Sequence, residues 1–219
     1  MARSGVPSRP KASGAAGADT RRALVEAAIA TLKSEGFSGA SARAIAKEAG
    51  CNQALVFYHF GSVVDLLLAA LDEVSARRLQ RYSAVMADVD GPDTLVALAS
   101  EVFREDMETR DVAVLVEMIA GASSTPGLGA EVSKRIAPWR AFARDAIESG
   151  LASSGLGSLL PASEVSHAVV ALYLGLEMLS HLDGDRDPAT ALFDQLGRLA
   201  PLLAAVTAPA PKSTEGEST

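Results

Sequence analysis

The stretch that decides the fold is AGCNQALVFYHFGS, residues 49–62. It places Gly50 and Asn52 directly before a short segment that crowds Phe57, Tyr58 and His59 together. A buried helix rarely carries so many polar tips, because each buried polar group without a partner costs about 1–3 kcal/mol. The segment therefore indicates side chains that serve something outside the fold.

The residues around this segment predict two short helices joined by a tight turn. Ser41 can cap the first helix, and Gly50 can supply the left-handed residue that ends it. Asn52 is placed to cap the second helix, over about residues 53–60. This is the helix-turn-helix arrangement, whose second helix lies in the major groove of DNA. It predicts that three polar side chains face a nucleic acid: Gln53, Tyr58 and His59.

The composition indicates a helical protein. Of the 219 residues, 48% are hydrophobic and 5% are aromatic, which is enough apolar material to bury a core. Valine and isoleucine fall in helix-period patterns, and no stretch alternates as a half-buried strand does. We therefore predict an all-α fold of about nine helices, with a separate three-helix unit at the N-terminus.

The charge is divided unevenly along the chain. The net charge of −7 would argue against a polyanionic partner. Residues 1–65, however, hold eight Lys or Arg against five Asp or Glu, a balance of +3, so the remainder carries −10. Such an asymmetry lets one end of a molecule approach nucleic acid while the other end is repelled.

Breaker residues predict where the other helices begin and end. We expect the first helix to start near Asp19, with Asp19 or Thr20 as its cap, and to end at Gly36. A long helix is expected from Ser62. The arginines near its end are interpreted as a solvated face: Arg77, Arg78 and Arg81.

Five further helices are predicted over about residues 92–109, 111–122, 130–154, 161–182 and 189–206. Pro138 is expected to interrupt or kink the third of these, because proline cannot donate to the preceding turn. Ser163 is expected to cap the fourth.

Motifs of common enzymes and metal sites are missing. There is no GxGxxG, GxxxxGK[ST], HExxH or GxSxG pattern, and Cys51 is the single cysteine. Glu177 and His181 are four residues apart on one helix, but His167 lies about 20 Å along the axis, so we interpret Glu177 and His181 as an ion pair. We expect no enzyme activity, no metal and no cofactor. The N-terminal segment lacks the apolar core of a secretion signal, so we expect a cytoplasmic protein.

The second half of the chain repeats large apolar residues at helical spacing on successive helices. Most of them are core, yet helical bundles also form ligand cavities between such residues. The residues predicted to line a cavity are Phe103, Met107, Leu115, Met118, Trp139, Phe142, Tyr173 and Leu176. Polar groups are expected from Tyr173, Glu117, Arg104 or His167. A mostly apolar molecule of unknown identity is the ligand that such a lining predicts.

A specific pattern runs over residues 41–66: Ser-x-x-x-Ile-Ala-x-x-Ala-Gly, then Asn-x-x-x-x-x-Tyr-His-Phe, then Asp-Leu. It resembles the DNA-binding domain of the tetracycline-repressor (TetR) family of transcriptional regulators. The resemblance is strong over about residues 19–70 and architectural beyond them. It implies a homodimer that binds a palindromic operator through its N-terminal helices and an effector through its C-terminal helices.

The resemblance also implies roles for individual residues. Arg43 and Gln53 match residues that can reach bases, and Ala54 and Leu55 can touch thymine methyl groups. The positions that contact or position phosphates are matched by Ser41, Asn52, Phe57, Tyr58 and His59. In three places the chain departs from the common family pattern: Phe57 replaces a tyrosine, Val63 replaces a lysine and Ser41 replaces a threonine.

The expected domains follow from the same resemblance. They are a disordered basic arm at 1–18, a helix-turn-helix domain at 19–65, an effector and dimerisation domain at 66–207, and a disordered tail at 208–219. The dimer is expected to use the last two helices, through Val165, Ala168, Val169, Leu172, Leu176, Leu179, Leu192, Leu196, Leu199 and Leu203. An alternative is that these residues only complete the core of a monomer.

Two functions fit the sequence. The first is a ligand-responsive dimeric repressor that a small, mostly apolar effector releases from DNA. The alternative is a small helical ligand-binding protein or enzyme in which the N-terminal domain is merely structural. Only the first predicts binding to DNA with a steep dependence on salt.

Overall fold

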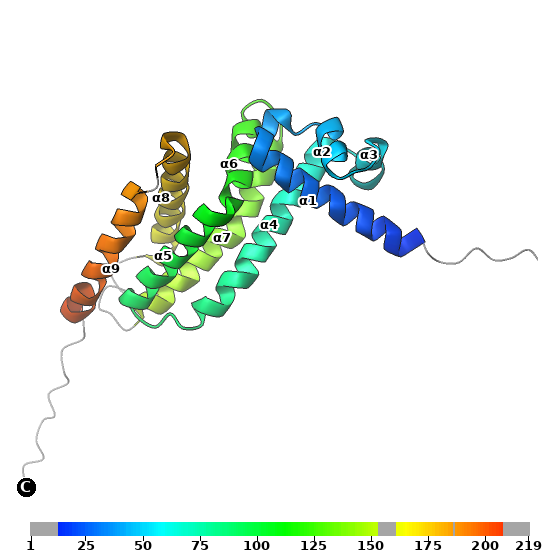
Figure 1. Cartoon of the computed structure of the whole chain (residues 1–219). Coiled ribbons are helices and arrows are strands. Elements are labelled where there is room, and N and C mark those ends of the chain that lie inside the picture. Colours follow the sequence, from blue (N-terminus) through cyan, green and yellow to red (C-terminus); the bar gives the residue numbers. More distant parts are fainter. Residues whose placement is uncertain (1–12, 153–160, 186, 208–219) are drawn as a thin grey trace, which may run out of the picture. The chain divides into compact units, whose positions relative to one another are not determined.

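The computed structural model of the chain describes residues 13–152, 161–185 and 187–207 (Figure 1). Over these residues it contains nine helices and no strand, which confirms the predicted all-α class. The chain divides into two compact units, Met1–Leu71 and Asp72–Thr219.

The first unit contains α1 (Ser13–Gly39), α2 (Ala42–Glu48), α3 (Ala54–Phe60) and the start of α4 (Val63–Met86). α1 packs against α2, and α2 packs against α3. The centre of this unit is built from side chains that are almost fully buried: Leu24, Leu32, Ile45, Val56 and Leu66. Burying these apolar faces holds the short α2 and α3 in place, because helices of seven residues are not stable alone.

The predicted polar side chains of the turn bond the backbone at the starts of both helices. The Ser41 side chain caps α2 by accepting a hydrogen bond from the backbone N–H of Ala44 at 3.2 Å. Gly50 has φ +65°, the left-handed conformation that ends α2. The Asn52 side chain accepts from the N–H of Ala54 at 2.8 Å, whereas the N-cap residue of α3 is Gln53, one position later than predicted.

The beginning of α1 differs from the prediction. The helix begins at Ser13 and not at Asp19. Asp19 pairs with Arg22 at 2.9 Å inside the helix, and Thr20 donates to the carbonyl of Ala16. Of the expected disordered arm, residues 1–12 lie outside the described residues and residues 13–18 are helical. The expected disordered tail, 208–219, also lies outside them.

The second unit contains the rest of α4 and five more helices. They are α5 (Pro92–Thr109), α6 (Asp111–Ala122), α7 (Leu128–Leu151), α8 (Ala162–Asp183) and α9 (Asp187–Thr207). α5 packs against α9 and α7, and α7 packs against α8 and α6. Tyr82, Leu98, Val102 and Ala146 form a buried cluster at the centre of the unit.

The structure differs from two predicted features of these helices. α7 is not interrupted at Pro138 but continues as one helix. Pro138 and Lys134 are both exposed, so the carbonyl that loses its donor lies on the side of α7 that faces water. Ser163 lies inside α8, whose N-cap is Pro161, and therefore does not cap it.

The apolar character of α8 is pronounced. Its length and hydropathy would suffice for a membrane span, and α3 with α4 passes the same test only as a pair bent by 67°. Only 17% of the most apolar window of α8 is buried within this chain. One such helix is weak evidence for a membrane, because a helix buried in a protein core or interface has the same composition.

Candidate nucleic-acid interface and effector cavity

α3 presents one face to the inside of the first unit and the other to solvent. Val56 is fully buried and fixes the inner face. On the outer side Gln53 is exposed, and Tyr58 is 81% exposed. The rings of Tyr58 and His59 pack edge to face with their centroids 4.9 Å apart. The packing leaves the Tyr58 hydroxyl accessible and restricts the orientation of its ring.

The other residues assigned to DNA also lie in or beside the turn. Ser41, Arg43, Asn52, Ala54 and Phe57 are exposed, whereas Leu55 and His59 are half-buried. Arg21 of α1 was not predicted from the sequence. Its guanidinium lies 4.8 Å from the centroid of the Phe60 ring at the end of α3. A basic residue next to the aromatic pair is a further candidate phosphate contact.

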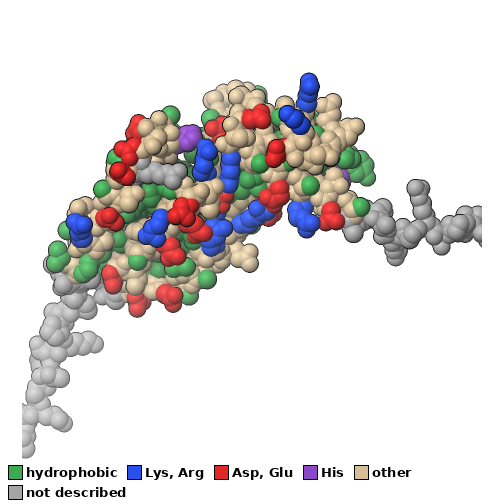
Figure 2. All heavy atoms as spheres, viewed as in Figure 1, with side chains coloured by type: hydrophobic (Ala, Val, Ile, Leu, Met, Phe, Trp, Pro, Cys, Tyr) green, Lys and Arg blue, Asp and Glu red, His purple; other side chains and the backbone are tan. Residues whose placement is uncertain are grey.

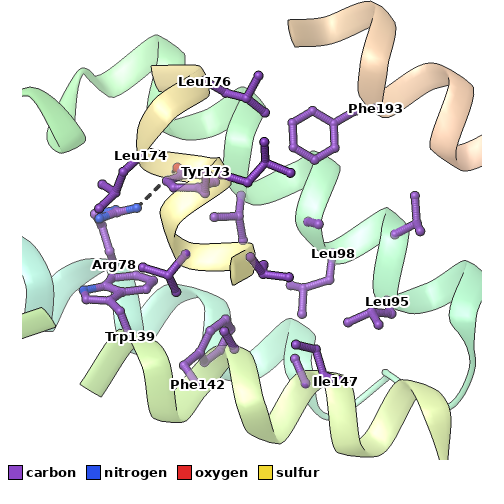
Figure 3. A pocket seen from close by; sticks show the side chains of 18 of the residues that line it. Arg78, Leu95, Leu98, Trp139, Phe142, Ile147, Tyr173, Leu174, Leu176 and Phe193 are labelled. Carbon is purple, nitrogen blue, oxygen red and sulfur yellow. Dashed lines mark hydrogen bonds between the residues drawn. The ribbon is translucent and has the colours of Figure 1, made fainter. Parts of the chain in front are cut away.

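The second unit contains a half-open cavity of about 260 Å³ (Figure 3). Of the predicted lining residues, five line it: Leu115, Trp139, Phe142, Tyr173 and Leu176. The other three are not lining residues. Phe103 and Met118 are buried in the core, and the Phe103 ring packs against Phe193 with a centroid distance of 4.8 Å. Helical spacing found the helices that surround the cavity but did not separate the cavity wall from the core behind it.

The cavity wall also carries a polar group that the sequence did not predict. Arg78, expected on a solvated face, is 4% exposed and lines the cavity. It forms an ion pair with the fully buried Asp106 of α5, donating from Nε to Oδ1 at 2.7 Å and from Nη2 to Oδ2. Its guanidinium carbon lies 4.2 Å from the centroid of the Trp139 ring. Arg77 does remain partly exposed, paired with Glu73 at 2.8 Å.

Two tyrosines complete this cluster around Asp106. Tyr173 donates to Asp106 Oδ2, and Tyr82 donates to Asp106 Oδ1 at 3.2 Å. Burial and then the charge of Asp106 raise the pKa of Tyr173 well above its usual value. Burial opposes the charge of Arg78 most strongly, but Asp106 and the neighbouring Tyr173 and Tyr82 together outweigh it, so the pKa of Arg78 is raised. The cluster therefore contains a charged pair and phenols that stay neutral near pH 7.

The other polar residues predicted for the cavity do not line it: Glu117, Arg104 and His167. Its polar lining residues include Arg78 and Tyr173. Glu177, predicted to pair with His181, is 6% exposed, and its Oε1 lies 3.3 Å from the Tyr173 hydroxyl. Among the described residues no three His, Cys, Asp or Glu side chains gather as a metal site requires.

α8 and α9 expose a set of large apolar side chains. Leu179 is 57% exposed and Leu199 is 49% exposed. Others predicted for an interface and exposed here are Ala168, Val169, Leu172, Leu192 and Leu196. Val165 and Leu176 are half-buried, and Leu203 lies beyond the residues whose side chains are described. Figure 2 shows hydrophobic side chains at the surface over α9.

A helix-turn-helix with an exposed second helix, followed by a larger helical unit, defines the class of a DNA-binding transcriptional regulator. A family model described as "Bacterial regulatory proteins, tetR family" matches residues 24–70. Residues 24–70 of this chain therefore carry the DNA-binding domain of the tetR family. The predicted family is thereby confirmed.

Curated relatives and solved structures agree with this assignment. HTH-type transcriptional regulators of Mycobacterium bovis and Mycobacterium tuberculosis, both called uncharacterized, are 27% identical over 128 residues. The match spans 58% of this chain and 66% of theirs. Their names support a regulator, and the match covers slightly less than two thirds of their length.

The similarity to solved structures shows the fold. A TetR-family member from Streptomyces coelicolor is 22% identical with a TM-score of 0.61, covering 81% of this chain and 98% of that one. FadR from Bacillus subtilis, in complex with stearoyl-CoA, is 14% identical with a TM-score of 0.67, covering 82% of this chain and 96% of that one.

Proposed function

We propose that the protein is a cytoplasmic, homodimeric transcriptional repressor that binds a palindromic operator and is released by a small, mostly apolar effector. The observation that carries the proposal is the exposed face of α3, with Gln53 and the 81% exposed Tyr58, directly after the capped turn. Gln53 and Arg43 suit base edges in the major groove, while Tyr58 suits a phosphate.

Dimerisation is supported by the exposed leucines of α8 and α9. Two copies of such a helix pair can bury their apolar faces as a four-helix bundle around a twofold axis. A twofold dimer places its two recognition helices one turn of the duplex apart, about 34–36 Å, so that both enter the major groove on one side. A palindromic operator is the DNA that matches this symmetry.

Release by an effector is supported by the cavity of the second unit. α4 belongs to both units, starting at Val63 directly after α3 and carrying Arg78 at the cavity wall. A ligand that binds better to one arrangement of α4 shifts the population toward that arrangement. The stearoyl-CoA of the Bacillus subtilis FadR complex is bound by that protein, at 14% identity, and a long acyl-CoA is the second candidate effector here.

Selection of genomic DNA by the purified full-length protein tests this function. Enriched fragments should share an inverted repeat whose half-sites lie about 10 base pairs apart, centre to centre. A protein carrying both Gln53→Ala and Tyr58→Ala is the matched control and should enrich nothing. Equal enrichment by both proteins, or none by either, would favour the alternative of a helical binding protein or enzyme with a structural N-terminal unit.

A further inference from the structure

The cavity wall is apolar apart from one polar corner. Only Arg78, Tyr173 and the indole of Trp139 contribute polar side-chain atoms among its lining residues (Figure 3). The Trp139 N–H is already used, because it donates to Ser75 Oγ at 2.8 Å. A ligand therefore meets hydrocarbon everywhere except beside Arg78 and Tyr173.

The charge of Arg78 is already balanced by a carboxylate. The Arg78 guanidinium binds both carboxylate oxygens of Asp106, and the Asp106 side chain is completely buried. Tyr173 is neutral, donates to the same carboxylate and lies with its hydroxyl 3.3 Å from Oε1 of a second buried carboxylate, Glu177. In a dry site the interaction between charges is much stronger than in water. A ligand carboxylate or phosphate would bring a further anion next to Asp106 and Glu177 without a partner, and an ammonium would bring a second cation next to Arg78.

One hydrogen-bonding edge of Arg78 remains open. The hydrogen bonds that Arg78 makes with described residues leave from Nε and Nη2, the latter also reaching the Tyr173 hydroxyl at 3.4 Å. Nη1 donates none of them, although the side chain is 4% exposed and lines the cavity. A ketone, ester, ether or hydroxyl oxygen can accept from Nη1 without adding charge.

The size of the cavity limits the ligand further. Its volume of about 260 Å³ equals that of roughly nine molecules of liquid water. A molecule of about ten non-hydrogen atoms fills such a space.

We propose that this cavity takes an uncharged, mostly apolar molecule of about ten non-hydrogen atoms, whose oxygen acceptor binds Arg78 Nη1, and that it discriminates against carboxylates, phosphates and amines of the same size. The inference rests on the proposed effector function and specifies the chemical class of the effector. It favours such a molecule over a long acyl-CoA, the second candidate, whose phosphates carry several charges.

The chain contains one tryptophan, and Trp139 lines the cavity, so its fluorescence reports on binding there. We would titrate the full-length protein with 2-octanone, octanoate and octylammonium, three probes of similar size. The ketone should shift the Trp139 emission with at least tenfold higher affinity than either ion. Octanoate binding as tightly as the ketone would overturn the inference, as would the failure of the ketone to bind up to its solubility limit.

The Asp106→Asn variant tests the cause of the selectivity. Without the Asp106 charge, the charge of Arg78 is uncompensated. The ratio of the octanoate affinity to the ketone affinity should therefore rise at least tenfold. Asp145→Asn is the matched control, because Asp145 pairs with Arg144 at 2.9 Å on the exposed surface of α7. It should leave the ratio unchanged. An unchanged ratio in folded Asp106→Asn protein would contradict the proposal.

A second variant, Arg78→Met with Asp106→Leu, removes the charge pair as a unit and tests the acceptor. The probe for comparison is 2-methyl-1-octene, in which a methylene replaces the ketone oxygen. In the double variant, the affinity for the ketone should fall at least tenfold relative to the affinity for this hydrocarbon. No relative loss would overturn the assignment of Nη1.

Operator binding, measured by gel shift on the same protein, separates this inference from the proposed function. Failure of the ketone to bind, with operator binding intact, rejects the cavity assignment and leaves the DNA-binding function standing. Ketone binding without any effect on the operator complex supports the cavity assignment and rejects release by effector.

Discussion

Gln53 and Tyr58 stand on the same short helix, yet they should contribute to binding in different ways. Gln53 can read a base edge, so Gln53→Ala should relax preference at one position of each half-site by about 1–3 kcal/mol. Tyr58→Ala should weaken binding to all duplexes alike, because a phosphate contact carries no sequence information. Affinities for the selected operator and for single-base variants of it measure both effects.

Ser34→Ala, at an exposed serine of α1 in the same unit, is the control and should change neither affinity nor preference. If both Gln53→Ala and Tyr58→Ala left operator binding unchanged, the assignment of α3 as the recognition helix would be wrong.

Arg78 illustrates a buried charge that depends completely on its partner. Arg78→Met leaves Asp106 buried without its cation, so the free energy of unfolding should fall by about 3–5 kcal/mol. Arg78→Met combined with Asp106→Leu removes both charges and should cost less than the single change. Urea denaturation of the two variants gives the comparison. A double variant less stable than the Arg78→Met variant would contradict the claim that the unpaired charge of Asp106 is the main cost of the single change.

At the scale of the element, the turn between α2 and α3 depends on one backbone conformation. Gly50 has φ +65°, and a Cβ added there would meet no atom within 4 Å, so the cost of Gly50→Ala is purely conformational. We expect a loss of about 1–2 kcal/mol in the free energy of unfolding of the first unit.

Gly17 provides the matched control for this change. It lies within α1, and an added Cβ there also meets no atom within 4 Å. Because its φ is not in the left-handed region, Gly17→Ala should be neutral or stabilise the helix by about 0.5–1 kcal/mol. Thermal unfolding of the two variants measures the difference. Equal midpoints would show that the conformation of Gly50 does not matter.

The same turn shows which parts of the fold can be predicted from sequence. The hydrogen bonds of the Ser41 and Asn52 side chains are local, since each side chain bonds a backbone N–H two or three residues away. Pairing such as that between Arg78 and Asp106 joins residues 28 positions apart, and nothing local marks it. An arginine on a helix has the same local pattern whether water or a buried carboxylate faces it.

The cavity shows the corresponding limit for a site. Apolar residues at helical spacing indicate which faces turn inward, and Trp139, Phe142 and Tyr173 were found this way. Whether an inward residue lines a cavity or packs behind it depends on helices that are distant in sequence. Phe103 packs against Phe193 of α9, 90 positions later, and is therefore core.

At the scale of the whole molecule, the exposed leucines of α8 and α9 predict self-association. Leu179→Glu with Leu199→Glu places charges at positions that are 57% and 49% exposed in one chain. The change should leave the folded chain intact but convert a dimer into monomers, because two buried carboxylates without partners strongly oppose association. Sedimentation velocity would measure the oligomeric state of the wild-type chain and of the double variant.

Ala130→Glu, at an exposed alanine near the start of α7, is the control and should remain dimeric. A wild-type chain that sediments as a monomer would contradict the dimer, and a double variant that stays dimeric would place the interface elsewhere.

The charge asymmetry of the chain also belongs to this scale. Residues 1–65 carry a balance of +3 and the remainder −10, which should orient the molecule as it approaches DNA. Binding would then depend on neutralising phosphates with basic residues of the first unit such as Arg21. Each neutralised phosphate releases counterions and makes the affinity dependent on salt.

The most direct test of the central claim is therefore the affinity for the selected operator as a function of salt concentration. A dimer that makes at least four phosphate contacts predicts a log–log slope of about −3.6 or steeper, since each contact contributes about −0.9. The Tyr58→Ala protein should bind more weakly at every salt concentration with a similar slope, because the phenol carries no charge. No measurable binding to any duplex at low salt, or a slope near zero, would contradict the claim that α3 presents Gln53, Tyr58 and His59 to DNA.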